Sequence, residues 1–205
     1  MVNTREAIRQ LNELKRLGKE IRLAADGWNE DWKTLIATLM SARTTDKKTI
    51  PVAEELFKKY NSLVKLSRAS TNHIGKIIRS VNFYKTKSKH IRELSQIIVK
   101  KYNGKIPHEF EKLIELPGVG RKTANVFLAE QNHDRIGVDT HVNWLSKQLG
   151  WTKSEKQEIV ERDLEKLFPK KYWKDLNWIL VRFGQTFPSR TKKKEILERI
   201  RKNKD

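Results

Sequence analysis

Cysteine is missing from the 205-residue sequence, and this absence excludes several kinds of chemistry. The chain cannot form a disulfide, use a thiolate nucleophile, or hold zinc or an iron–sulfur cluster through cysteine ligands. From the residues themselves we therefore expect no metal and no other cofactor.

Long apolar runs are missing as well. No segment approaches the length that spans a membrane, and the first residues, Met1-Val2-Asn3-Thr4-Arg5, carry no secretory signal. We therefore expect a chain that stays inside the cell, in the cytoplasm, and that has no membrane partner.

Acidic residues are few relative to basic ones. The chain has 25 Asp and Glu against 44 Lys and Arg, which gives a formal net charge of +19. A surface field of this sign favours polyanionic partners, among which nucleic acid is the leading candidate. A basic protein bound to a membrane surface is the rival interpretation, but the lack of apolar runs argues against it.

Apolar residues recur at helical spacing almost throughout, whereas strand-like alternation does not persist for more than a few positions. We therefore predict an all-α protein with roughly ten helices. Helix start signals stand before amphipathic runs at Thr4, Asp46, Thr71 and Ser154. Glycines placed to end a helix are Gly18 and Gly150.

The C-terminal segment 189–202 is strongly charged but carries apolar residues at helical spacing. We predict a surface helix that packs on the protein, in preference to an arm dedicated to DNA binding. The residues expected to make this packing are Phe187, Ile196, Leu197 and Ile200.

The most informative segment is Leu116-Pro117-Gly118-Val119-Gly120-Arg121-Lys122-Thr123-Ala124-Asn125. Helical stripes flank it on both sides, so the pattern predicts a helix-hairpin-helix. We expect Gly118 and Gly120 to adopt positive φ and Val119 to anchor the turn in the core. Backbone N–H groups of the turn, together with the helix start at Arg121, suit a DNA phosphate without any base readout. Taken alone, such a motif is equally consistent with a simple turn between helices.

Lys122 falls in the first turn of the helix that follows the hairpin. We expect the helix dipole and the neighbouring charge of Arg121 to act against the charged form of the amine there. A neutral amine can attack the anomeric carbon of a deoxyribose, expel the base and leave a Schiff base, which permits elimination of the 3′ phosphate. A lysine that only contacts a backbone phosphate is the simpler alternative.

Asp139 lies in Val138-Asp139-Thr140-His141, just before another expected helix. An aspartate at this place is typical of an N-cap. A carboxylate held rigidly by capping can also stabilise positive charge on a sugar or assist proton transfers, so the two roles are compatible. His141 is a candidate for a DNA contact, although a structural histidine is the favoured alternative, and we assign it no catalytic role.

These residues resemble the signature of the endonuclease III family of helix-hairpin-helix (HhH-GPD) DNA glycosylases and AP lyases. Looser similarity at 39–46, 81–88 and 178–184 extends the resemblance over roughly residues 28–187. The resemblance implies a two-lobed all-helical fold with the active site in the cleft between the lobes. It assigns a six-helix barrel lobe to 27–133, with the helix-hairpin-helix at about 109–131, and a second lobe to 1–26 plus 134–205.

The resemblance also implies an activity. It makes Lys122 the Schiff-base nucleophile and Asp139 the catalytic aspartate of a bifunctional DNA glycosylase and AP lyase in base excision repair. The expected partner is double-stranded DNA with damaged bases or abasic sites, and oxidised pyrimidines are the favoured lesions. The protein is expected to act as a monomer associated with the nucleoid.

Three departures from the family pattern affect these expectations. The family's iron–sulfur cluster cannot form, because the matching stretch Thr186-Phe187-Pro188-Ser189-Arg190 has no cysteine. Arg43 stands where the family often has a glutamine that fills the gap left by the extruded nucleotide. Asn82-Phe83 replaces the more usual Gly-Leu in the loop that wedges the opposite strand.

We predict DNA contacts from the hairpin, from the loops at the second and third departures, and from the start of the helix after the wedge loop. Phe83 or Tyr84 is a candidate to stack in the DNA as this wedge, and a core aromatic is an equally good interpretation of the sequence. The full set of predicted DNA contacts is Leu116, Gly118, Val119, Gly120, Arg121, Arg43, Phe83, Tyr84, Lys85, Lys87 and His141.

Two alternatives remain open at this point. The first is a glycosylase with little or no lyase activity, or with another lesion such as 8-oxoguanine, uracil, hypoxanthine or an alkylated purine. The second is a helix-hairpin-helix protein that recognises DNA structure without catalysis. Phosphate binding requires the hairpin but not the distant Asp139, so the combination of Lys122 and Asp139 argues against a pure binder.

Overall fold

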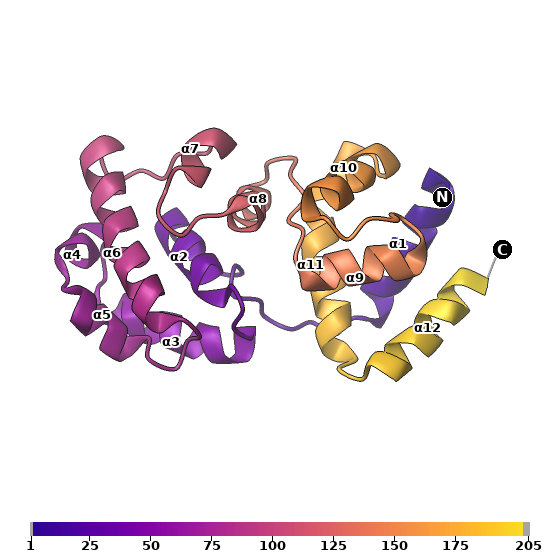
Figure 1. The fold of residues 1–205 in the computed structure, drawn as a ribbon, viewed down its shortest axis with the longest axis horizontal. Coiled ribbons are helices and arrows are strands. Elements are labelled where there is room, and N and C mark those ends of the chain that lie inside the picture. Colours follow the sequence, from indigo (N-terminus) through magenta and orange to yellow (C-terminus); the bar gives the residue numbers. More distant parts are fainter. Residues whose placement is uncertain (1, 203–205) are drawn as a thin grey trace. The chain divides into compact units, whose positions relative to one another are not determined.

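The computed structural model describes residues 2–202, and all regular elements among these residues are helices. The all-α prediction is confirmed. The chain forms two compact units, shown in Figure 1. The middle unit is Arg22–Gln131, and the terminal unit combines the described residues up to Ile21 with those from Asn132 onward.

The middle unit contains seven of the α-helices. They are α2 (Asp31–Ser41), α3 (Asp46–Lys59), α4 (Leu63–Arg68), α5 (Thr71–Ile77), α6 (Tyr84–Lys101), α7 (Phe110–Ile114) and α8 (Arg121–Glu130). The helix α6 packs against α4 and α5, while α2 packs against α3 and α8. Most residues of α2 and α8 are buried, so these two helices contribute much of the core of the unit.

The terminal unit contains the two ends of the chain. Its helices are α1 (Thr4–Leu17), α9 (Thr140–Leu149), α10 (Gln157–Leu167), the 3-10 helix η1 (Lys170–Tyr172), α11 (Trp173–Thr186) and α12 (Arg190–Lys202). Helix α11 packs against α1 and α9. A buried polar link crosses the core, because Trp151 donates from Nε1 to Oε1 of Gln10 over 2.6 Å. This bond lets both polar groups be buried without a desolvation penalty.

The charged C-terminal segment forms α12 and is docked, as predicted. Leu197 and Ile200 are buried, and Ile196 and Phe187 pack against the same core. Arg9 on α1 donates from Nη2 to the carbonyl oxygen of Ile200 over 2.5 Å, which satisfies one of the free carbonyls at the end of α12. Apolar packing and this cap therefore hold the tail in a chain that has no cysteine.

The helix start signals are mostly displaced by one residue. Asn3 and Ser70 provide the capping oxygens of α1 and α5, so Thr4 and Thr71 are the first helical residues and not the caps. Gly18 and Gly150 end α1 and α9 as predicted, and Gly150 adopts φ 76°. The predicted number of helices is too low because α4, α5 and α7 have only 6, 7 and 5 residues. Such lengths are too short for a periodic pattern to stand out.

Candidate active site

The connection between α7 and α8 forms a tight hairpin whose apolar residues face inward. Leu116 and Val119 are buried in the core of the middle unit, and the Val119 amide donates to the carbonyl of Leu116 over 3.0 Å. Gly118 and Gly120 are exposed beside them. The hairpin therefore presents its backbone, and not the side chains of Leu116 and Val119, to solvent.

The two glycines of the hairpin differ in conformation. Gly118 adopts φ 78°, as predicted, but the prediction of positive φ at Gly120 is wrong. Gly120 is the N-cap of α8 with φ −88° and ψ 174°, which is the extended conformation that N-caps ordinarily take. A Cβ atom at Gly120 would meet nothing within 4 Å. The space beside Gly120 is thus open to a close approach by a ligand.

Gly118 has a second reason to be glycine. A Cβ atom there would lie 2.7 Å from Nδ1 and 2.9 Å from Cβ of His90 on α6. The imidazole therefore lies directly against the turn and supports it. Nothing in the sequence pattern around His90 indicated this contact, because it joins α6 to a turn that lies far from it in the sequence.

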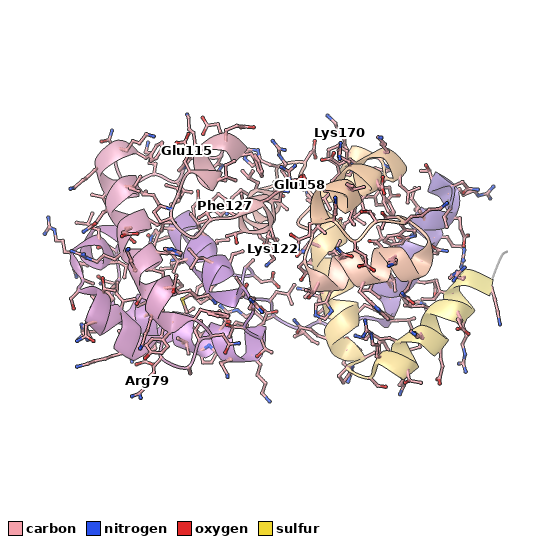
Figure 2. All side chains as sticks on the ribbon, viewed as in Figure 1. Arg79, Glu115, Lys122, Phe127, Glu158 and Lys170 are labelled. Atoms are coloured by element: carbon pink, nitrogen blue, oxygen red, sulfur yellow. The ribbon has the colours of Figure 1, made fainter. Side chains whose placement is uncertain are left out.

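Lys122 lies in the first turn of α8, where the sequence predicted it. It is the second residue of that helix, and its neighbour Arg121 places its guanidinium 5.0 Å from the ring of Phe110. Figure 2 shows Lys122 and Phe127, which both belong to α8. The side chain of Phe127 is completely buried. Among the described residues of the middle unit, Lys122 has no ion-pair partner.

The structure corrects the prediction that Lys87 contacts DNA. The side chain is buried, with 7% exposure, and its Nζ donates to the carbonyls of Met40 and Ala42 over 2.7 and 2.6 Å. A third, longer contact reaches Oγ1 of Thr44 at 3.4 Å. Burial, followed by the nearby charge of Lys122, lowers the pKa of Lys87 to about 8. An amine whose donors are used inside the protein is not available to a phosphate.

Arg43 and Phe83 lie on two loops of the middle unit and contact each other. The guanidinium carbon of Arg43 lies 5.1 Å from the ring centroid of Phe83. Both residues have left-handed backbones, with φ 57° and 60°. Phe83 is 58% exposed, whereas Tyr84 packs partly against the core. Lys85, in the first turn of α6, is exposed.

Asp139 is the N-cap of α9, as predicted. Its Oδ1 accepts a hydrogen bond from the Val142 amide over 2.8 Å, and its backbone is extended. This bond fixes the carboxylate at the end of the helix. The second carboxylate oxygen, Oδ2, has no donor among the described residues of the terminal unit.

His141 is half-buried and packs against α11 within the terminal unit. A Cβ atom at Gly184 would lie 2.2 Å from Nδ1 of His141, so the ring lies directly on the backbone of α11. Gly184 belongs to a segment that the sequence comparison with the family had already singled out, but its role in seating His141 is visible only in the structure.

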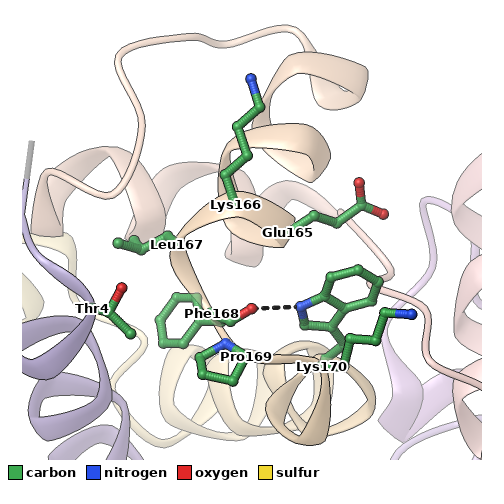
Figure 3. A pocket seen from close by; sticks show the side chains of 8 residues that line it. Thr4, Glu165, Lys166, Leu167, Phe168, Pro169 and Lys170 are labelled. Atoms are coloured by element: carbon green, nitrogen blue, oxygen red, sulfur yellow. Dashed lines mark hydrogen bonds between the residues drawn. The ribbon is translucent and has the colours of Figure 1, made fainter.

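One open pocket lies apart from all of these residues. It has a volume of about 410 Å³ and lies at the end of α10 within the terminal unit (Figure 3). Trp173 closes one side, and its Nε1 donates to the Phe168 carbonyl over 2.8 Å. The pocket contains neither Lys122 nor Asp139 and carries no converging set of catalytic groups.

The donor chemistry of the chain does not fit a metal cluster. Within residues 2–202, no group of three or more His, Cys, Asp or Glu side chains could hold a metal ion. The stretch from Thr186 to Arg190 has no thiolate, so it does not fit the family's iron–sulfur cluster. No helix within residues 2–202 is long and apolar enough to cross a membrane.

An all-helical fold, an exposed hairpin and a lysine in the first turn of the next helix together define a helix-hairpin-helix protein. Residues 36–170 match the family model described as HhH-GPD superfamily base excision DNA repair protein. The chain belongs to this family.

Individual relatives agree with the family match. Endonuclease III of Thermotoga maritima is 38% identical over 157 residues, which cover 76% of this chain and 74% of the relative. Endonuclease III of Synechocystis is 38% identical over 153 residues, covering 74% of this chain and 70% of the relative. A solved structure of a trapped endonuclease III–DNA covalent intermediate superposes with a TM-score of 0.84 at 30% identity, covering 92% of this chain and 89% of that one.

Proposed function

We propose that this protein is a base-excision-repair DNA glycosylase with AP lyase activity, acting on double-stranded DNA that contains damaged bases or abasic sites. The observation that carries the proposal is the position of Lys122, directly after an exposed hairpin and in the first turn of α8. The similar endonuclease III that was trapped covalently on DNA supports the same chemistry.

The hairpin binds the DNA backbone and needs no base contact. The exposed backbone at Gly118 and Gly120 lets a phosphate approach, and the free N–H groups at the start of α8 offer hydrogen bonds. Arg121 adds a positive charge beside them. Leu116 and Val119 contribute through the backbone that their buried side chains hold in place.

Lys122 carries out the covalent chemistry. Its neutral amine attacks C1′ of the damaged nucleotide, the glycosidic bond breaks, and the base leaves with the bonding electrons and takes up a proton. Cleavage of the C1′–O4′ bond, with transfer of the remaining N–H proton to O4′, then opens the sugar and gives a Schiff base. Removal of a 2′ proton then expels the 3′ phosphate, which cleaves the strand by β-elimination.

Asp139 supports the attack electrostatically. The transition state for loss of the base carries positive charge on the sugar, which a fixed carboxylate stabilises. Capping of α9 immobilises the Asp139 carboxylate before substrate binds. His141, in the first turn of the same helix, contacts the DNA, and its ring is held in place by the backbone of α11 at Gly184.

Arg43 and Phe83 fill the space that the extruded nucleotide leaves. An exposed aromatic ring can enter a base stack, and extrusion is least costly at a damaged base. The exposure of Phe83 supports it as the wedge in preference to Tyr84. Lys85 contacts a phosphate nearby. The favoured lesions are oxidised pyrimidines.

We further propose that the enzyme works as a monomer in the cytoplasm, at the nucleoid, and that it needs no metal or other cofactor. The complete lack of cysteine supports the absence of an iron–sulfur cluster. The docking of α12 through Leu197, Ile200 and the Arg9 cap explains how the C-terminal region is held without one.

Borohydride trapping tests the proposed chemistry. Wild-type protein incubated with abasic-site duplex and sodium borohydride should form a covalent protein–DNA adduct. Duplexes with thymine glycol, uracil, 8-oxoguanine or hypoxanthine then identify the lesion, and thymine glycol is expected to react fastest. A folded wild type that gives no adduct with any of these substrates contradicts the lyase assignment.

Substitutions at the two hairpin glycines should separate folding from DNA binding. Gly120→Ala places its Cβ in open space, so it should lower the free energy of unfolding by at most about 1 kcal/mol. It should nevertheless weaken binding to abasic-site DNA roughly tenfold, because the methyl group obstructs one charged hydrogen bond. Gly118→Ala introduces strain at φ 78° and a clash with His90, so it should destabilise the fold measurably more. Unchanged affinity in Gly120→Ala argues against phosphate binding at this turn.

A further inference from the structure

Two loops of the middle unit each present a residue in an uncommon backbone conformation. Arg43 follows α2 with φ 57°, and Phe83 precedes α6 with φ 60°. Neither residue is glycine, and non-glycine residues in this region of conformational space are uncommon and cluster at functional sites. The family pattern has other residues at both positions. The two departures meet in space, because the guanidinium of Arg43 stacks on the ring of Phe83 at 5.1 Å.

Asn82 ties the two loops together directly. Its side-chain Nδ2 donates to the carbonyl oxygen of Arg43 over 2.5 Å, and its backbone amide donates to Oγ1 of Thr44 over 3.1 Å. Asn82 is itself the third residue that departs from the family pattern in these loops. A glycine at this position would lack the first of the two bonds.

The buried side chain of Lys87 makes further hydrogen bonds to the loop that carries Arg43. Its buried Nζ donates to the carbonyl of Met40 at the end of α2 and to that of Ala42 beside Arg43, and it approaches Oγ1 of Thr44. Lys87 lies on α6, one turn after Phe83, and its backbone amide donates to the Phe83 carbonyl over 3.0 Å. One lysine thus joins the turn of Arg43 to the start of the helix that Phe83 caps.

We infer that Asn82 and Lys87 are positioning residues that hold Arg43 and Phe83 as one preassembled stacked pair, which enters the DNA as a unit when a nucleotide is extruded. This inference rests on the proposed glycosylase function. In the alternative arrangement, the two side chains would belong to independent loops and would enter the DNA separately. Because its geometry is fixed before DNA binds, the ordering of both loops does not oppose binding.

The electrostatics of Lys87 agree with a functional role. Its pKa of about 8 lies below that of a free lysine, so the folded protein carries the buried charge at a cost in stability at neutral pH. This cost declines as the pH rises through 8 towards the ordinary lysine value, because the neutral amine is then favoured in the folded state. An apolar residue at position 87 would fill the space without this cost. The hydrogen bonds from Lys87 to the carbonyls beside Arg43 explain why a lysine is present.

The test uses two substrates and a matched control. Lys87→Met and Asn82→Ala are compared with wild type and with Lys89→Met, which removes an exposed amine on the same helix. The first substrate is a single strand with a preformed abasic site, on which borohydride trapping requires Lys122 but no duplex opening. The second is a thymine glycol duplex with 2-aminopurine opposite the lesion, whose fluorescence rises when the opposite base loses its stacking.

Lys87→Met should keep wild-type adduct formation on the single strand and lose roughly 10²-fold in excision from the duplex, together with the fluorescence rise. Asn82→Ala, an exposed position at which folding is not at risk, should show a smaller loss in the same direction. Lys89→Met should match wild type on both substrates. If both variants match Lys89→Met on the duplex, or if they lose activity equally on both substrates, the positioning role is wrong. A wild type that gives no adduct on either substrate overturns the glycosylase and lyase proposal instead.

Discussion

Lys122→Ala is expected to give no borohydride adduct with abasic-site DNA and to lower strand cleavage by roughly 10⁴-fold or more, since loss of a catalytic nucleophile has effects of this size. Its affinity for the same DNA should fall only modestly, because the hairpin and Arg121 remain. Single-turnover cleavage and a binding titration on one preparation measure the two quantities.

Lys122→Arg is the matched variant for this prediction. It keeps a positive charge at the start of α8, but a guanidinium stays protonated and forms no Schiff base with the sugar. It should therefore bind DNA like the wild type and still fail to cleave. If either variant retains the adduct, another amine is the nucleophile, and Lys122 is only a phosphate contact.

The second large effect is expected at Asp139, where charge and helix capping can be separated. Asp139→Asn keeps an oxygen that accepts from the Val142 amide, and asparagine caps helices about as well as aspartate. Its stability should therefore stay close to that of the wild type. Base excision should nevertheless fall roughly 10²- to 10³-fold, because the fixed negative charge is gone.

Asp139→Ala removes both the charge and the cap. It should lose a similar amount of activity and, in addition, about 1 kcal/mol of unfolding free energy. Thermal denaturation and single-turnover excision of both variants give the comparison. If Asp139→Asn retains most of the wild-type excision rate, Asp139 acts as a cap alone and has no catalytic role.

Local sequence signals predicted the parts of this fold that depend on neighbouring residues. The helical spacing predicted the all-α class, and the short motif around Gly118 predicted a hairpin followed by a helix at Arg121. Asp139 was predicted at the N-cap of α9 for the same reason, since a cap bonds an amide three residues ahead. The docked tail followed from three apolar residues at helical spacing.

The errors have equally local causes. Gly120 was expected to share the positive φ of Gly118, but the helix begins one residue later and makes it an extended N-cap. The start signals at Thr4 and Thr71 are each displaced by one residue, because the preceding Asn3 and Ser70 provide the capping oxygens. The local sequence is compatible with a helix that begins at either of two neighbouring residues. The packing of the helix decides between these two starts.

Lys87 shows what sequence could not provide. A lysine among basic residues near an expected DNA surface is ordinarily exposed, and nothing in its neighbourhood indicates burial. Its acceptors lie at the end of α2 and in the turn that follows, more than forty positions earlier in the chain. The packing of α6 beside these carbonyls buries the amine of Lys87. The residue therefore stabilises the protein interior, whereas the sequence predicted a phosphate contact.

The sequence by itself thus determined the helical class, the absence of cysteine chemistry, the basic character, and the hairpin with Lys122 behind it, because each depends on composition or on residues within a few positions of one another. The tertiary structure alone decided that His90 supports Gly118, that His141 packs on Gly184, and that Asn82 and Lys87 join the loops of Arg43 and Phe83. These contacts join residues far apart in the chain. Their partners are selected by helix packing, for which a single sequence has no local signal.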